Sequence, residues 1–168
     1  MPIAARLGVL ASKHHSVSVP VSLDWVYDQY TVKMLDLSPA ILGVAHFNRE
    51  RGIKGIGINK NQHRYTQRMT LAHEVAHDVL EHPDRFFTCR LGDWWRARIE
   101  LEAQWAASVV LMPFNRLFDA MIDGATICDL EDLFEVDRRL IEIRLNLPDV
   151  VRSVRAEMRR QATTASLL

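Results

Sequence analysis

Cysteine is scarce in this chain: its 168 residues contain only Cys89 and Cys128, and neither belongs to a CxxC pair. Two cysteines are too few for a disulfide framework and fit a reducing cytosol. The chain also lacks a run of 18 uncharged apolar residues, and its N-terminal segment has no apolar core long enough for a signal peptide. We therefore expect a cytoplasmic protein with no membrane-spanning segment and no membrane partner.

An excess of charge is equally absent, because 21 Lys and Arg residues balance 21 Asp and Glu residues. A neutral chain has no general attraction to a polyanion, so nucleic acid is not the expected partner. The chain also has no internal repeat, no low-complexity segment and no composition shift that would mark a boundary. A sequence of this length predicts a single domain over residues 1–168.

One motif decides the interpretation: His73-Glu74-Val75-Ala76-His77, which has the form HExxH. It lies in a stretch without Gly or Pro that favours a helix, where residues i and i+4 lie about 40° apart around the axis. His73 and His77 can therefore bind one metal ion, while Glu74 is turned aside and can act on a water molecule. This predicts a zinc peptidase with Glu74 as general base. An amphipathic helix with two hydrogen-bonded histidines is the competing interpretation.

Strands are expected only before this motif. Residues 22–30 predict a helix capped by Ser22. Two aliphatic runs, 41–47 and 53–58, predict a β-hairpin. Gly55 and Gly57 leave one face of its second strand bare, so an extended substrate could add to that edge, or the glycines could serve close packing.

Helices are expected through the rest of the chain, at 65–82, 96–112, 115–122, 130–134 and 138–145, with Asp137 capping the last. Between the first two, residues 83–95 predict an aromatic loop that lines a cleft or covers the core. The predicted fold class is α+β, mostly helical, with a small antiparallel sheet or hairpin before the HExxH helix. The catalytic core falls at about residues 40–113, and a C-terminal helical subregion with helix-turn-helix rhythm at about 114–160.

Two histidines leave a catalytic zinc one protein ligand short. A histidine six residues after His77 would supply it in one class of zinc peptidase, but that position is Pro83. His82 lies five residues after His77 and would point about 140° away from it on a continuous helix. We expect His82 to interact with the helix end instead.

The remaining candidates are two glutamates on the 96–112 helix. Glu100 shares its face with Ala103 and Ala107, whose small side chains let another helix approach closely. Glu102 shares its face with Trp105, which is better suited to fill a core. We therefore predict Glu100 as the third ligand and keep Glu102 as the alternative. Both could also be solvated surface carboxylates.

Three blocks of this sequence resemble the ImmA/IrrE family of zinc metallo-endopeptidases. They are residues 68–77 around HExxH, residues 100–107 and residues 111–113, and the likeness covers about residues 40–145. The resemblance implies a zincin-like metallopeptidase fold, a Zn²⁺ ion held by His73, His77 and Glu100, and Glu74 as the catalytic base.

The chain departs from the family pattern at three positions. Gln104 stands where Asn or Asp is usual, and Trp105 and Met69 each stand where Phe is common. Gln104 could still support a metal ligand through a hydrogen bond. For the group that stabilises the oxyanion, Tyr65 and His63 are the candidates.

The resemblance also implies a partner. Members of the family characteristically cleave a helix-turn-helix repressor of the Xre type, which releases stress-response or mobile-element genes. Two alternatives stay open. One is a non-catalytic zinc-binding interaction protein of a toxin–antitoxin pair. The other is a DNA-binding regulator that contacts phosphates through Arg138, Arg139 and Arg144, although Glu131 and Asp132 lie nearby and argue against it.

Overall fold

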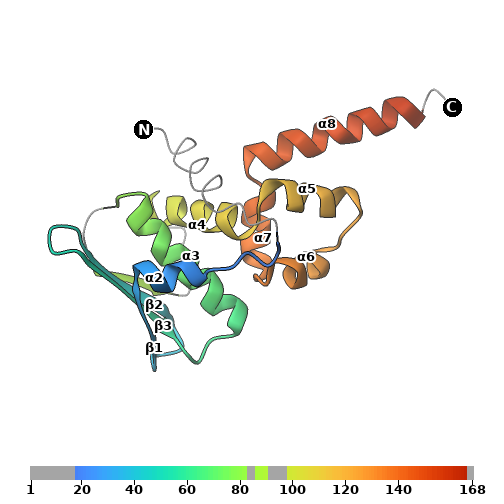
Figure 1. The fold of residues 1–168 in the computed structure, drawn as a ribbon. Helices are drawn as coiled ribbons and strands as arrows, with labels where there is room; N and C mark the ends of the chain where they lie inside the picture. The colour runs from blue at the N-terminus through green and yellow to red at the C-terminus, as the bar shows by residue number, and fades with distance from the viewer. Residues whose placement is uncertain (1–17, 83–85, 91–97, 166–168) are drawn as a thin grey trace.

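The computed structural model describes residues 18–82, 86–90 and 98–165. Over these residues the architecture is mixed α+β, which confirms the predicted fold class. Figure 1 shows the strands gathered at one side of the molecule and the last helices at the other. The elements in chain order are α2 (Asp24–Gln29), β1 (Thr31–Leu35), β2 (Ile41–Asn48), β3 (Ile53–Asn59), α3 (Arg64–Val79), β4 (Phe86–Arg90), α4 (Arg98–Leu111), α5 (Phe114–Ile122), α6 (Ile127–Phe134), α7 (Arg138–Leu145) and α8 (Pro148–Ala165).

The sheet has four strands among the described residues, in the order β1-β3-β2-β4. β2 and β3 form the predicted hairpin, joined by a turn in which Gly52 adopts a positive φ of 65°. β3 also pairs with β1 in parallel over Gly55 to Asn59. The idea that substrate adds to an edge formed by β3 is therefore wrong, because β3 is a central strand with both sides paired.

Two strands were not predicted. β1 follows directly after Tyr30 and is an outer strand whose residues are exposed or half-buried, so it has no apolar alternation to reveal it. β4 occupies residues 86–90, where the sequence predicted a loop, and it pairs antiparallel with β2. Trp94 and Trp95, the other aromatic residues of that predicted loop, lie outside the described residues.

α3 lies between the sheet and α4, so the HExxH helix is buried on both sides (Figure 1). Its residues from Met69 to Asp78 are all buried. α4 packs against α3, and Ala103 and Ala107, the small residues on the face of Glu100, are both 0% exposed. Close helix packing of this kind brings side chains from the two helices to one point.

α5, α6, α7 and α8 form the C-terminal part of the described chain. α6 begins with a reciprocal capping box between Thr126 and Asp129, and α7 begins at Asp137, whose side chain accepts a hydrogen bond from the Leu140 amide. The predicted cap at Asp137 is thus confirmed. Among the described residues, no helix is both long and apolar enough to cross a membrane.

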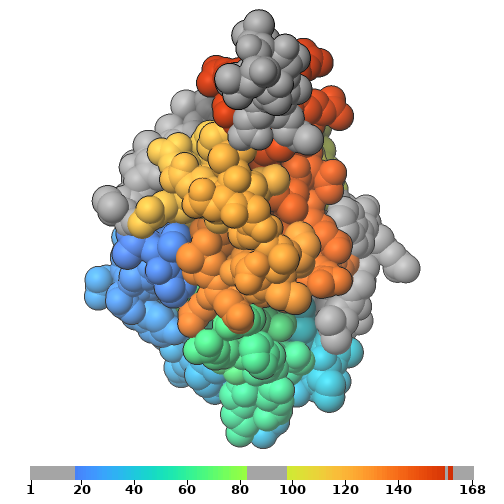
Figure 2. All heavy atoms as spheres, turned by 90° about the vertical axis from the view of Figure 1, so that its right-hand side faces the viewer, coloured from blue at the N-terminus to red at the C-terminus, as the bar shows by residue number. Residues whose placement is uncertain are grey.

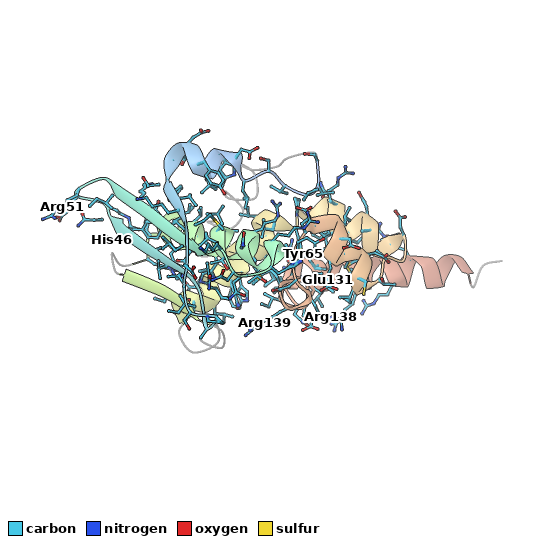
Figure 3. The ribbon with its side chains drawn as sticks, turned by 90° about the horizontal axis from the view of Figure 1, so that it is seen from below. His46, Arg51, Tyr65, Glu131, Arg138 and Arg139 are labelled. Carbon is cyan, nitrogen blue, oxygen red and sulfur yellow. The ribbon has the colours of Figure 1, made fainter. Side chains whose placement is uncertain are left out.

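Arg144 is a structural residue and not a surface cation. Its side chain is 1% exposed, its Nε donates to the Met112 carbonyl, and its guanidinium forms two hydrogen bonds with Asp149. It therefore ties the end of α4 to α7 and α8. The expectation that Arg144 contacts phosphates is wrong. Figure 3 shows Arg138 and Arg139 in the same region of the C-terminal helices as Glu131. The backbone amide of Arg138 donates to the Glu131 carboxylate.

Candidate metal centre

α3 brings His73 and His77 together on one face. Each is 1% exposed, and their Nε2 atoms lie 3.1 Å apart. The two residues lie one helical turn apart, and 16 residues of unbroken helix keep the spacing regular. Two imidazole nitrogens therefore point at the same volume inside the protein.

Glu100 of α4 reaches this volume from the opposite side. Its Oε2 lies 3.2 Å from Nε2 of His73 and 3.6 Å from Nε2 of His77. Ligands about 2.0 Å from a tetrahedral zinc ion are separated from one another by roughly 3.3 Å. The three atoms match this spacing, and in the part of the chain that the structure describes they form the one group of this kind that could hold a metal ion.

The electrostatics of this cluster suit a cation. Although burial alone raises it, the hydrogen bonds and charges of His73 and His77 hold the pKa of the Glu100 carboxyl well below its usual range. Burial lowers the pKa of His77, which favours the neutral ring with a lone pair available. A metal ligand must be deprotonated in just this way.

Glu74 lies beside the cluster but does not belong to it. Its side chain is 0% exposed, and neither carboxylate oxygen has a hydrogen-bond partner among the described residues. Burial, together with the nearby charge of Glu100, raises the pKa of Glu74 well above its usual value. A buried carboxylate without a partner requires an explanation. A water molecule bound to a metal ion at the adjacent cluster would supply the missing hydrogen bond.

The end of α3 places His82 where the sequence did not predict it. The helix stops at Val79, and Glu81 takes a left-handed conformation with φ 56°. The amide of His82 then donates back to the His77 carbonyl, which closes a Schellman turn. The prediction that His82 points away from His77 is wrong, because its Nδ1 lies 2.9 Å from Nδ1 of His77.

Glu102 lies behind this histidine. Its Oε2 is 3.4 Å from Nε2 of His82, and its Oε1 accepts from Arg98 at 2.6 Å. The group that could hold a metal contains Glu100 and not Glu102. The geometry therefore favours the first of the two predicted glutamates.

The comparison with known proteins agrees with this geometry. A family model, Peptidase_M78, described as the IrrE N-terminal-like domain, matches residues 30–146. The chain belongs to this family. No curated protein matches the chain. Membership implies a metal-dependent peptidase, and hence a protein substrate, and it covers the sheet, the HExxH helix and the helices up to α7.

The predicted oxyanion-stabilising residues of this IrrE-like domain lie at the wrong end of α3. His63 is the N-cap and accepts from the Tyr65 amide, and Tyr65 donates its hydroxyl to Asp132 of α6. Tyr65 precedes His73 by eight residues, which is about 12 Å along a helix. Figure 2 shows the start of α3, in green, lying directly beneath the orange C-terminal helices. The structure brings neither residue to the metal cluster.

Gln104 is fully buried, as a supporting residue would be. Neither atom of its side-chain amide has a hydrogen-bond partner among the described residues, however. The predicted hydrogen bond to a metal ligand is therefore not seen. Of the other departures from the family pattern, Met69 is buried in the core and Trp105 packs against it from a half-buried position.

Gly43 of β2 is a feature of the site that the sequence interpretation missed. A β-carbon at this position would lie 2.6 Å from Cγ2 of Thr70 and 3.6 Å from Oε1 of Glu74. The absence of a side chain thus lets α3 approach the sheet at the turn that carries the base. Glycine within a strand is the sequence signal for such an approach, although it is present at three positions in this hairpin.

We expect Gly43→Ala to lower the free energy of unfolding by about 1–3 kcal/mol, the usual cost of overpacking. The double variant Gly43→Ala/Thr70→Ser should recover part of this loss, because serine lacks Cγ2 but keeps the hydroxyl that donates to the Thr66 carbonyl. Chemical denaturation measures both. Gly55→Ala is the matched control, since its β-carbon would meet nothing closer than 3.8 Å. A Gly43→Ala protein as stable as Gly55→Ala would contradict the packing argument.

Proposed function

We propose that this protein is a zinc-dependent endopeptidase that cleaves a helix-turn-helix repressor of the Xre type. The observation that carries the proposal is the meeting of Nε2 of His73, Nε2 of His77 and Oε2 of Glu100 within 3.1–3.6 Å of one another, beside the buried carboxylate of Glu74. Membership of a metallopeptidase family supports it.

The donor set supports zinc as the metal. Two neutral imidazoles and one carboxylate are a combination found in catalytic zinc sites, which use three protein ligands and leave a fourth position open. A closed structural site would need a fourth protein ligand, and the cluster of described residues supplies three. When bound there, zinc polarises the scissile carbonyl and lowers the pKa of water towards about 7.

Glu74 supplies the proton transfers. Its carboxylate takes a proton from the attacking water, and the same oxygen then delivers that proton to the nitrogen of the leaving peptide. Burial favours this role, because a raised pKa brings the carboxyl closer to the working pH. Glu100, with its lowered pKa, remains ionised beside it. The two carboxyl groups thus divide the tasks of proton transfer and charge compensation.

An extended peptide segment fits the edge of the sheet formed by β4. β4 is an outer strand among the described residues, and it pairs with β2 at Gly43, the residue packed against the Glu74 turn. A segment added along β4 would gain main-chain hydrogen bonds without requiring particular side chains. A segment in a folded helix cannot add to a sheet edge in this way, so the site favours an extended segment of its substrate.

The decisive experiment incubates the zinc-loaded protein with Xre-type repressors encoded beside its gene. We expect one repressor to be cut into defined fragments, cutting to stop on addition of a chelator, and cutting to return with added zinc. Gel electrophoresis and mass spectrometry give the cleavage site.

A stable complex without fragments would instead support a zinc-binding interaction protein. A salt-sensitive gel shift with DNA would support the DNA-binding alternative, which the burial of Arg144 has already weakened. Either result, without proteolysis, would overturn the proposed activity.

A further inference from the structure

A line of side chains leads from the metal cluster towards the surface. Nε2 of His77 faces the cluster, and Nδ1, on the other side of the ring, lies 2.9 Å from Nδ1 of His82. Nε2 of His82 lies 3.4 Å from Glu102, which pairs with Arg98 at 2.6 Å. The side chains of His82 and Glu102 are only 6% and 13% exposed, whereas Arg98 is 85% exposed.

Metal binding would fix where the protons of this line lie. A neutral imidazole carries one proton. If Nε2 of His77 gives its lone pair to a metal, the proton is on Nδ1 and is donated to Nδ1 of His82. His82 then accepts at Nδ1, so its own proton is on Nε2 and is donated to the Glu102 carboxylate. Both hydrogen bonds therefore run in the same direction, from His77 to His82 and from His82 to Glu102.

The backbone holds His82 in place without help from a metal. The Schellman turn fixes its amide to the His77 carbonyl at 3.0 Å. Arg49, at the tip of the β2–β3 hairpin, donates from Nη1 to the His82 carbonyl at 3.1 Å and from Nη2 to the Asp78 carbonyl. The backbone of His82 is therefore held in place before any ligand arrives, and its ring lies between His77 and Glu102, as a partner that orients another side chain needs to be.

We infer that His82 and Glu102 are positioning residues, which hold the ring of His77 in the orientation and tautomer that bind the metal through Nε2. This inference rests on the proposed metal centre. Hydrogen-bond partners of metal ligands typically contribute 10- to 100-fold to metal affinity. His82 acts directly on His77, and Glu102 acts through His82.

The test measures zinc affinity of the metal-free full-length proteins by competition with a chromophoric chelator. His82→Ala should bind zinc 10- to 100-fold more weakly than the parent. His82→Asn should recover most of the affinity, because its Oδ1 takes the place of Nδ1 as acceptor. Glu102→Gln, which keeps an acceptor but loses the charge, should fall between them. As a control, each metal-free protein should show a cooperative thermal unfolding transition, which establishes that the variant is folded.

A second readout follows the proton itself. In the zinc-loaded parent, the Nδ1 proton of His77 should give a slowly exchanging NMR signal, which His82→Asn keeps and His82→Ala loses. A parent that binds no zinc would overturn the metal centre together with this inference. A parent that binds zinc, with His82→Ala within threefold of it, would overturn the inference alone. Equal losses in His82→Ala and His82→Asn would also overturn it, because they would indicate packing and not hydrogen bonding.

Discussion

Replacing Glu74 with Gln should leave zinc bound to the protein and slow cleavage of the repressor by roughly 10²- to 10⁴-fold, the range expected on loss of a general base. The amide has the shape of the carboxylate but cannot take a proton from water. Because Glu74 is 0% exposed and has no hydrogen-bond partner among the described residues, a neutral side chain of the same size should fit without loss of stability.

Three measurements separate this outcome from misfolding. Zinc content after dialysis should equal that of the parent, the unfolding temperature should be equal or higher, and the single-turnover cleavage rate should fall. Glu142→Gln is the matched control, since this exposed glutamate lies on α7, outside the site. The Glu142→Gln protein should cleave the repressor as fast as the parent. If Glu74→Gln cuts as fast as Glu142→Gln, Glu74 is not the base.

Local patterns in the sequence were sufficient to predict the middle of the site. The i, i+4 spacing places His73 and His77 on one helix face wherever that helix lies, and unbroken helix-forming residues make its presence predictable. The choice of Glu100 over Glu102 also followed from a helix face, because Ala103 and Ala107 mark the side that can approach α3. The hairpin of β2 and β3 was predictable for a similar reason, as two aliphatic runs separated by a polar turn.

The surroundings of the site depended on contacts that local patterns do not encode. The position of His82 follows from the left-handed conformation of Glu81, which ends α3 three residues before the predicted end. Glycine usually marks such a turn, and a glutamate gave no signal. β1 and β4 are outer strands of five residues, held by pairing with segments distant in sequence. Gly43 has a role different from Gly55 only because α3 packs over it.

The third ligand offers the other large effect. Glu100→Ala should weaken zinc binding by roughly 10²- to 10³-fold and reduce cleavage with it. Four-ligand structural zinc sites bind with about 10–16 kcal/mol, which is roughly 2.5–4 kcal/mol for each ligand. Applied to Glu100, that is a factor of about 10² to 10³ in the dissociation constant. The parent should also gain thermal stability from added zinc, and Glu100→Ala should lose most of that gain at the same zinc concentration.

Glu102→Ala is the matched comparison, because it removes a glutamate from the same helix two residues away. It should keep one zinc per chain and bind more weakly than the parent by a smaller factor than Glu100→Ala, since Glu102 contacts His82 and not the cluster. Chelator competition orders the three proteins, and zinc-dependent unfolding temperatures should follow the same order. If Glu102→Ala lost its zinc while Glu100→Ala retained a full equivalent, the ligand would be Glu102. The close approach of Glu100 to both histidines, at 3.2 and 3.6 Å, predicts the opposite.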